Sequence, residues 1–243
     1  MKLLTTFLAS VSIFASAQID ISIDTPLAEL PKSVSCPEGQ VALVADFKAD
    51  RPEGKIPVFL VNRSDHDIKL GAQDGDVYLK LESLTDTGQW VRSQPHVFSW
   101  CGNSYDFSPV IRKGHFLMIE GYQAPGGRKA KIRYRLYLQK DLDLVTQDGD
   151  GLCLDADIKT AAVDKLALRV GSLELVASVA RGEMKAPDVG DRTRDMQPEA
   201  IWQLGDDRFP ANKVLPILDE VDTKFPKYKD MTSDVRRRIS QRK

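Results

Sequence analysis

The stretch KAKIRYRLYLQ, residues 129–139, decides the fold, because apolar and polar side chains alternate along it. Ile132, Tyr134 and Leu136 fall at every second position and would share one face of an extended strand. Arg133 and Arg135 would share the opposite face. A period of two is typical of a β-strand with one buried and one wetter face, whereas an amphipathic helix repeats about every 3.6 residues. The stretch therefore predicts a half-buried strand.

Short β-rich runs surround this strand along the chain. Val77–Leu84 alternates in the same way, and Asp86-Thr87-Gly88 predicts a hairpin turn into Trp90–Arg92. The other predicted strands are Val41–Phe47, Ile56–Asn62, Ile68–Leu70, His96–Cys101, Phe116–Ile119, Leu152–Ile158 and Leu166–Val176. Many short strands at close spacing favour antiparallel pairing over a βαβ architecture. We expect a mainly β protein built as an antiparallel, Ig-like β-sandwich.

The chain divides into four predicted segments. They are a signal peptide (residues 1–17), an irregular, proline-interrupted lead (18–40), the β-sandwich domain (41–181), and a linker with a short helical C-terminal extension (182–243). The predicted helices of the extension are Pro198–Leu204, Ala211–Thr223 and Ser233–Lys243. Because proline is poorly tolerated inside a helix, we expect the second of these to begin near Leu215, with Pro216 in its first turn.

The N-terminal residues are typical of a secretory signal. Lys2 supplies a positive charge, Leu3–Phe14 form a mostly apolar run, and Ala15-Ser16-Ala17 offers small residues for cleavage after Ala17. The apolar run is shorter than the roughly 20 residues that span a bilayer. We therefore expect a secreted or periplasmic protein with no transmembrane segment after cleavage.

Composition limits the classes of partner. With 34 basic and 35 acidic residues, the formal net charge is −1, which gives no general attraction for nucleic acid or an anionic membrane. We expect no nucleic-acid partner, and instead an unidentified protein or glycan partner in the cell envelope. The most basic segment is the C-terminus, which could contact an anionic lipid, a cell-wall polymer or a protein. Its cations are Arg236, Arg237, Arg238, Arg242 and Lys243.

The three cysteines are an odd set for an oxidising compartment. At most one intramolecular disulfide can form, and we expect it between Cys101 and Cys153, since both lie in the strand-rich part while Cys36 lies in the lead. The alternative is three reduced, buried thiols, because free cysteine often packs as a small apolar residue. Cys101 could also be a catalytic nucleophile, but His96, His115 and Asn103 are close to it only in sequence.

The hexapeptide Trp100-Cys101-Gly102-Asn103-Ser104-Tyr105, followed by the Arg-rich strand at residues 131–136, carries a resemblance to known proteins. Over about Val58–Leu138 the chain resembles a family of uncharacterised secreted bacterial β-sandwich proteins that carry this WCGNSY-type motif. The resemblance implies a sandwich fold and an extracytoplasmic location. It implies no particular reaction, cofactor or ligand.

Two sets of residues are candidates for binding. Trp100, Asn103, Tyr105 and Tyr122 could form a ligand surface, with Trp90 as a further platform ring, although aromatic side chains in sandwiches more commonly pack in the core. Asp148 and Asp150 could ligate calcium, but the spacing fits an EF-hand poorly and a hairpin loop explains the same residues.

Taken together, these patterns predict a secreted or periplasmic, non-enzymatic binding or assembly module with no cofactor. Two alternatives stay open. One is an extracytoplasmic hydrolase with a site near Cys101, and the other is a calcium-stabilised carbohydrate-binding module.

Overall fold

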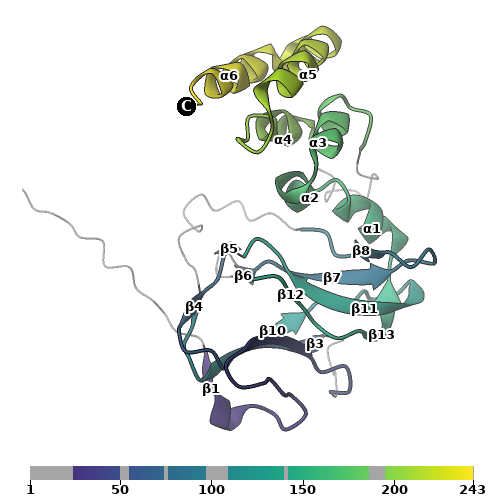
Figure 1. Cartoon of the computed structure of the whole chain (residues 1–243). Helices are drawn as coiled ribbons and strands as arrows, with labels where there is room; N and C mark the ends of the chain where they lie inside the picture. The colour runs from purple at the N-terminus through teal and green to yellow at the C-terminus, as the bar shows by residue number, and fades with distance from the viewer. Residues whose placement is uncertain are drawn as a thin grey trace, which may run out of the picture.

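The structure is a computed structural model that describes residues 24–49, 55–73, 76–96, 109–139, 142–185 and 195–242. Its first half is built from antiparallel strands, and its second half from helices that extend away from them (Figure 1). The prediction of a mainly β protein with antiparallel sheets and C-terminal helices is therefore confirmed.

One sheet has four strands in the order β1-β10-β3-β2, and every neighbouring pair is antiparallel. The strands are β1 (Thr25–Pro26), β10 (His115–Gly121), β3 (Ile56–Asn62) and β2 (Val41–Ala45). β1 is an edge strand, which is where a proline such as Pro26 can be accommodated because it lacks a backbone N–H to donate. A short 3-10 helix, Leu27–Glu29, follows it.

The second sheet has five strands, centred on the strand that the sequence predicts best. β11 (Arg128–Leu136) pairs with β7 (Leu79–Leu84), β12 (Leu144–Val145) and β13 (Gly149–Cys153), and β8 (Trp90–Arg92) pairs with the other side of β7. Two small ladders join β4 (Ile68–Lys69) to β9 (Val110–Ile111) and β5 (Ala72–Gln73) to β6 (Asp76–Val77). The hairpin predicted at Asp86-Thr87-Gly88 connects β7 to β8.

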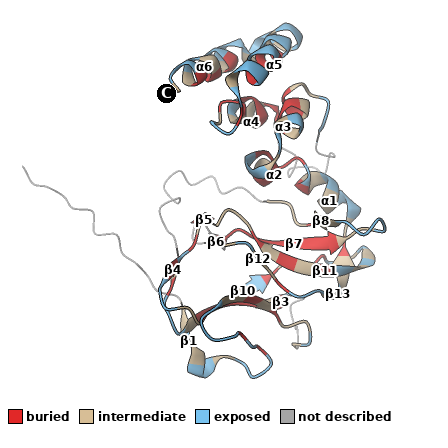
Figure 2. Cartoon of the chain, viewed as in Figure 1, coloured by how far each residue is buried: buried red, intermediate tan, exposed pale blue. Residues whose placement is uncertain are grey.

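The two sheets share one apolar core. Val58 and Leu60 of β3 are fully buried in the same cluster as Ile132 and Tyr134 of β11. Figure 2 shows buried residues in the strands of both sheets. Removing this apolar surface from water is the main force that holds the sheets together. The alternation read in residues 129–139 is confirmed for Ile132, Tyr134 and Leu136, all of which are buried.

A smaller apolar cluster lies on the other face of the four-stranded sheet, away from the main core. Phe59, Val61 and Phe116 pack there against Val34 and Cys36 of the lead. The predicted irregular lead therefore covers a sheet through apolar contacts.

The helical part begins directly after β13. Its elements are α1 (Asp155–Ala161), α2 (Lys165–Val170), α3 (Leu173–Ala180), α4 (Gln197–Gln203), α5 (Ala211–Lys224), a 3-10 turn (Pro226–Tyr228) and α6 (Lys229–Ser240). The helices share a core of their own, which contains Leu168, Val176, Ile201 and Leu218. Among the described residues, no helix combines the length and the apolar character needed to cross a bilayer.

The predicted strands Leu152–Ile158 and Leu166–Val176 are wrong beyond Cys153. In the second range, helices form because side chains cap their starts: Asp164 accepts a hydrogen bond from the Ala167 N–H, and Ser172 accepts one from the Leu175 N–H. In the first range, β13 ends at Cys153 and α1 begins at Asp155 without a side-chain cap. The change from strands to helices therefore falls at Leu154 and not near Gly182, the end of the predicted sandwich domain.

The C-terminal helices are predicted correctly in number and order, with shifts at their starts. The expectation that the second begins near Leu215 is wrong, because α5 begins at Ala211 and Pro216 lies inside it. Val214, Leu218 and Val221 of this helix are fully buried, which offsets the hydrogen bond lost at the proline. α6 begins at Lys229 and not at Ser233.

Two glutamine side chains each form two hydrogen bonds to the backbone of one residue, one with its N–H and one with its carbonyl, as a neighbouring strand would. Gln147 accepts from the Ala45 N–H at 3.3 Å and donates to the Ala45 carbonyl at 2.5 Å. Gln139 does the same at Gly71, at 2.7 and 3.0 Å. Gln147 thereby satisfies backbone groups at the edge strand β2 and ties it to the segment before β13.

We predict that Gln147→Glu lowers the free energy of unfolding by about 1 kcal/mol at pH 7, because the carboxylate cannot donate to the Ala45 carbonyl. Urea denaturation followed by circular dichroism measures the change. Gln241→Glu, at an exposed position just after α6, is the matched control, and an equal loss in both variants would show that the bridge contributes nothing.

Candidate functional site

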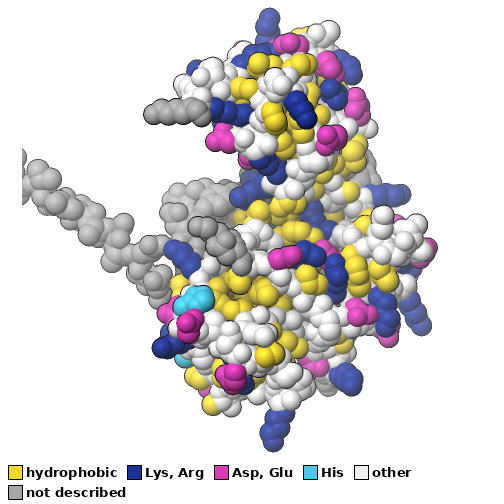
Figure 3. All heavy atoms as spheres, viewed as in Figure 1, with side chains coloured by type: hydrophobic (Ala, Val, Ile, Leu, Met, Phe, Trp, Pro, Cys, Tyr) yellow, Lys and Arg dark blue, Asp and Glu magenta, His cyan; other side chains and the backbone are white. Residues whose placement is uncertain are grey.

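The strands of the second sheet carry an excess of positive charge on the side away from the shared core. We call this side the cationic face. It is formed by Lys80 and Glu82 of β7, Trp90 and Arg92 of β8, Lys129, Lys131, Arg133 and Arg135 of β11, and Asp150 of β13, which lies opposite Lys131. The strand register places Glu82 opposite Arg133 on one side and opposite Arg92 on the other. Figure 3 shows Lys and Arg side chains where the sheet meets the helices.

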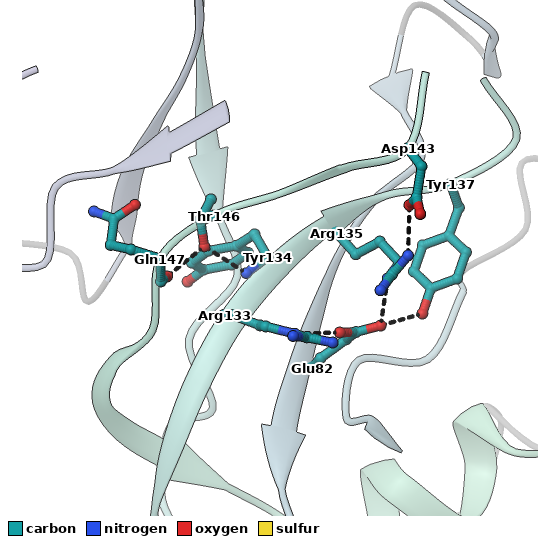
Figure 4. A network of polar contacts seen from close by, with 8 residues as sticks. All are labelled: Glu82, Arg133, Tyr134, Arg135, Tyr137, Asp143, Thr146 and Gln147. Atoms are coloured by element: carbon teal, nitrogen blue, oxygen red, sulfur yellow. Dashed lines mark hydrogen bonds and ion pairs between the residues drawn. The ribbon is translucent and has the colours of Figure 1, made fainter. Parts of the chain in front are cut away.

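The Glu82 carboxylate is the centre of a polar network (Figure 4). Its Oε2 accepts from Arg133 Nε at 2.7 Å, and its Oε1 accepts from Arg135 Nε at 3.0 Å and from the Tyr137 hydroxyl at 2.8 Å. Arg135 also donates to Asp143 at 2.5 Å. The Glu82 side chain is only 6% exposed, so these donors replace its water. Burial, and then the Glu82 charge, raise the pKa of Tyr137 far above its usual value, which keeps this donor protonated.

The β11 cations form a regular row. Side chains on one face of a strand are spaced by about 6.6 to 7 Å, because each residue advances the chain by about 3.3 Å. Lys129 and Lys131 are exposed, whereas the Arg133 and Arg135 side chains are 21% and 28% exposed. The Arg133 guanidinium stacks on the Trp90 ring, with 4.2 Å between the guanidinium carbon and the ring centroid. A row of this kind can contact an extended anionic chain.

A buried ion pair joins the sheet to the helices. Arg92 Nη2 lies 2.6 Å from Asp164 Oδ1, and the two side chains are 9% and 6% exposed. Asp164 also accepts from the backbone N–H of His96 at 2.6 Å and from that of Ala167 at 2.9 Å. Arg92 Nη2 donates to the Ala161 carbonyl as well. The Asp164 carboxylate therefore connects β8, the segment after β8 and the start of α2 through its ion pair and hydrogen bonds.

The His96 ring lies among cations at this junction. Burial, together with the charges of Lys80, Arg92, Lys165 and Arg169, lowers the pKa of His96 to about 3. The ring lies against Tyr78, with 5.5 Å between the ring centroids. His96 is therefore neutral at physiological pH and adds no charge to the junction.

The structure describes only part of the predicted ligand surface. Trp100, Asn103 and Tyr105 lie outside the described residues, as does Cys101. Tyr122 is described, and its hydroxyl donates to Asp157 of α1 at 2.8 Å, while its carbonyl accepts from the Tyr134 hydroxyl at 2.8 Å. Tyr122 thus connects the segment after β10 to a helix, and its role in ligand binding stays a prediction.

The predicted calcium ligands are exposed: Asp148 lies just before β13 and Asp150 lies within it. Asp150 pairs with Lys131 at 2.9 Å. The described part of the chain contains no cluster of three or more His, Cys, Asp or Glu residues that could hold a metal ion. Calcium binding through Asp148 and Asp150 is given no support by this arrangement.

The described cysteines are both free. Cys36 and Cys153 are buried thiols, and burial is the largest effect raising the pKa of Cys36. The predicted disulfide between Cys101 and Cys153 is not supported, because Cys153 is free; Cys101 itself lies outside the described residues.

The basic C-terminus is used within the helical part. Arg236 pairs with Asp219 and Asp222 of α5 at 2.7 and 2.8 Å, and Arg242 pairs with Asp207 at 3.0 Å. Arg238 stacks on the Trp202 ring at 4.2 Å. These contacts give Arg236, Arg238 and Arg242 roles within the helical part, while Arg237 pairs with Asp234 inside α6 and Lys243 lies outside the described residues.

We predict that Asp164→Asn lowers the free energy of unfolding by roughly 3 kcal/mol, because the amide keeps the shape of the helix cap but leaves the buried Arg92 charge uncompensated. Asp150→Asn removes an exposed ion pair and should change stability little. Chemical denaturation of both variants measures the difference. Equal small effects would show that the junction tolerates an unpaired Arg92.

We predict that His96 makes the fold sensitive to acid. Its pKa is about 3 when folded and about 6.5 in an unfolded chain, so between these values the unfolded state binds a proton that the folded state does not. Stability is therefore lost as the pH falls through this window. Melting temperatures measured from pH 7 to pH 4 should fall less steeply in His96→Gln than in the wild-type chain, and parallel curves would contradict this.

Sequence reasoning missed the cationic face as a site, although its row is visible in the sequence: Lys129, Lys131, Arg133 and Arg135 occupy every second position of one strand. The Arg92–Asp164 contact has no comparable signal, because its two residues are separated by 72 positions.

No protein-family model matches the chain, and no curated protein shows a significant match to it. The resemblance of residues 100–105 to secreted bacterial sandwich proteins stays a prediction, and the residues of the cationic face themselves carry the functional proposal.

Proposed function

We propose that the chain is a secreted or periplasmic, non-enzymatic binding module whose ligand is an anionic glycan of the cell envelope, bound along the cationic face. The observation that carries the proposal is the row Lys129, Lys131, Arg133 and Arg135 on one side of β11. The signal-like residues 1–17 support the location.

The charge of the cationic face is a local property. The whole chain has a formal net charge of −1, yet the cationic face carries six basic side chains and only two acidic ones, Glu82 and Asp150. The basic residues of this face are Lys80, Arg92, Lys129, Lys131, Arg133 and Arg135. A local excess of one sign raises the concentration of oppositely charged ligands at that surface, while the balanced remainder gives no general attraction for polyanions.

The spacing of the row favours a polymer over a small ion. Successive side chains on one face of β11 are about 6.6 to 7 Å apart, so four cations can meet several anionic groups of one extended chain. Trp90, which stacks on Arg133 at the side of the row, adds a flat apolar surface of the kind that sugar rings contact.

We further infer that the two sheets form the Ig-like sandwich expected from the sequence. The shared core between β3 and β11 supports this, as does the return of β10 to pair with β3 after the chain has passed through the second sheet. Loops and faces of such sandwiches commonly serve as binding surfaces, which is an argument from analogy alone.

The test is binding of polygalacturonate, a carboxylated polysaccharide, to the chain beginning at Gln18. We expect affinity that falls with added salt, and roughly tenfold weaker binding by the Lys129→Gln/Lys131→Gln double variant, because two exposed charge contacts are lost. Isothermal titration calorimetry measures both effects.

The matched control is Lys224→Gln/Lys229→Gln, which removes the same charge from exposed positions in the helical part. It should bind as the wild-type chain does. Equal weakening in both double variants, or equal affinity for a neutral glucan, would overturn the proposal.

A further inference from the structure

The guanidinium of Arg92 is only partly satisfied. Its Nη2 donates to Asp164 and to the Ala161 carbonyl. Its Nη1 is buried and has no hydrogen-bond partner among the residues that the structure describes. The Arg92 side chain is 9% exposed. A buried, charged donor without an acceptor is costly, which points to an acceptor from outside the chain.

The two carboxylates beside Arg92, those of Asp164 and Glu82, accept hydrogen bonds from other groups. Asp164 uses Oδ1 for Arg92 and the Ala167 N–H, and Oδ2 for the His96 N–H. Glu82, opposite Arg92 in the strand register, accepts from three donors on β11 and the segment after it. Neither carboxylate accepts a hydrogen bond from Arg92 Nη1.

Cations from three elements converge on the same junction. Lys80 of β7, Arg92 of β8, and Lys165 and Arg169 of α2 are all close enough to His96 to lower its pKa. Arg169 Nη1 lies 3.4 Å from the Tyr78 hydroxyl, and its guanidinium carbon lies 5.9 Å from the Tyr78 ring centroid. Since Arg169 can only donate, the Tyr78 hydroxyl accepts there and keeps its own hydrogen to donate elsewhere.

We propose that Arg92, Arg169 and Tyr78 form a site for a tetrahedral oxyanion, a phosphate or sulfate group, at the junction of β8 and α2. Arg92 Nη1 supplies the buried donor, Arg169 supplies a second, exposed guanidinium, and the Tyr78 hydroxyl supplies a neutral donor. The site shares Arg92 with the cationic face but includes none of the Lys129–Arg135 row, and it goes beyond the proposed glycan binding.

The experiment measures binding of inorganic phosphate to the full mature chain at constant ionic strength, with sodium chloride as the balancing salt. We expect a saturable rise in melting temperature and a matching calorimetric isotherm. Sulfate should act like phosphate, and acetate more weakly. A phosphate or sulfate ester on a sugar, tested as glucose 6-phosphate and glucose 6-sulfate, distinguishes a glycan source from the free ion.

The decisive variant is Arg169→Gln, because Arg169 is exposed and its loss leaves the buried Arg92–Asp164 pair intact. We expect roughly tenfold weaker phosphate binding from the loss of one charge-assisted contact. Arg237→Gln, on the exposed face of α6, is the matched control and should bind normally. Arg92→Lys, which keeps the charge but removes the second donor of the fork, should also bind weakly if it folds.

A second measurement follows the His96 ring by nuclear magnetic resonance, assigned with His96→Gln. Bound phosphate should raise the pKa of His96 from about 3, because the anion offsets the surrounding cations. No stabilisation beyond that of chloride, or equal affinity in Arg169→Gln and the wild-type chain, would overturn the site. Lys129→Gln/Lys131→Gln should retain phosphate binding, so failure of the glycan proposal and failure of this one are distinguishable.

Discussion

The buried carboxylate of Asp164 is the contact on which the joining of sheet and helices depends. It neutralises Arg92 of β8, accepts from the His96 backbone and caps α2. A buried ion pair is favourable only when its remaining hydrogen bonds are made, and Asp164 makes them with groups from two different elements. Formation of α2 and its attachment to the sheet are therefore coupled, because the same oxygen atoms serve both.

The attachment continues from α2 into the rest of the helical part. Arg208 donates to the Leu168 carbonyl at 2.5 Å and to the Arg169 carbonyl, near the C-terminal end of α2, where a cation also opposes the negative end of the helix dipole. Leu168 itself is fully buried in the helical core. α2 thus faces the sheet through its capping residue and the helices through its apolar side chain, which makes this short helix the link between the two cores.

The sequence predicts the parts of this fold that depend on local pattern. The alternation in residues 129–139 and the turn at Asp86-Thr87-Gly88 depend on neighbours a few positions apart, and the structure contains both. The helices between Asp155 and Ala180 are misread as strands because short apolar runs suit either structure. The caps at Asp164 and Ser172 distinguish α2 and α3, whereas α1 has no side-chain cap. The same distinction between local pattern and long-range packing applies to the two candidate sites.

The β11 row is local and follows from alternation, since Arg133 and Arg135 must face away from Ile132 and Tyr134. The junction at Arg92 is not local. It exists only because tertiary packing brings α1 and α2 to β8. The separation of Arg92 and Asp164 along the chain gives no sequence signal that predicts their contact. The sequence therefore identifies the strand that carries the charge, but not the helix that completes a site beside it.

The cationic face combines stability and binding through one electrostatic balance. Arg135 and Lys80 are direct partners in the β11–β7 register, and like charges in that position repel. Two carboxylates relieve part of this repulsion by accepting hydrogen bonds from Arg135. They belong to Asp143 and to Glu82, which lies two residues after Lys80 on the same face of β7. An anion bound along the cationic face would lower the remaining repulsion between the cations, because it adds negative charge. The same cations that cost stability in the free protein thus supply the attraction for the proposed ligand.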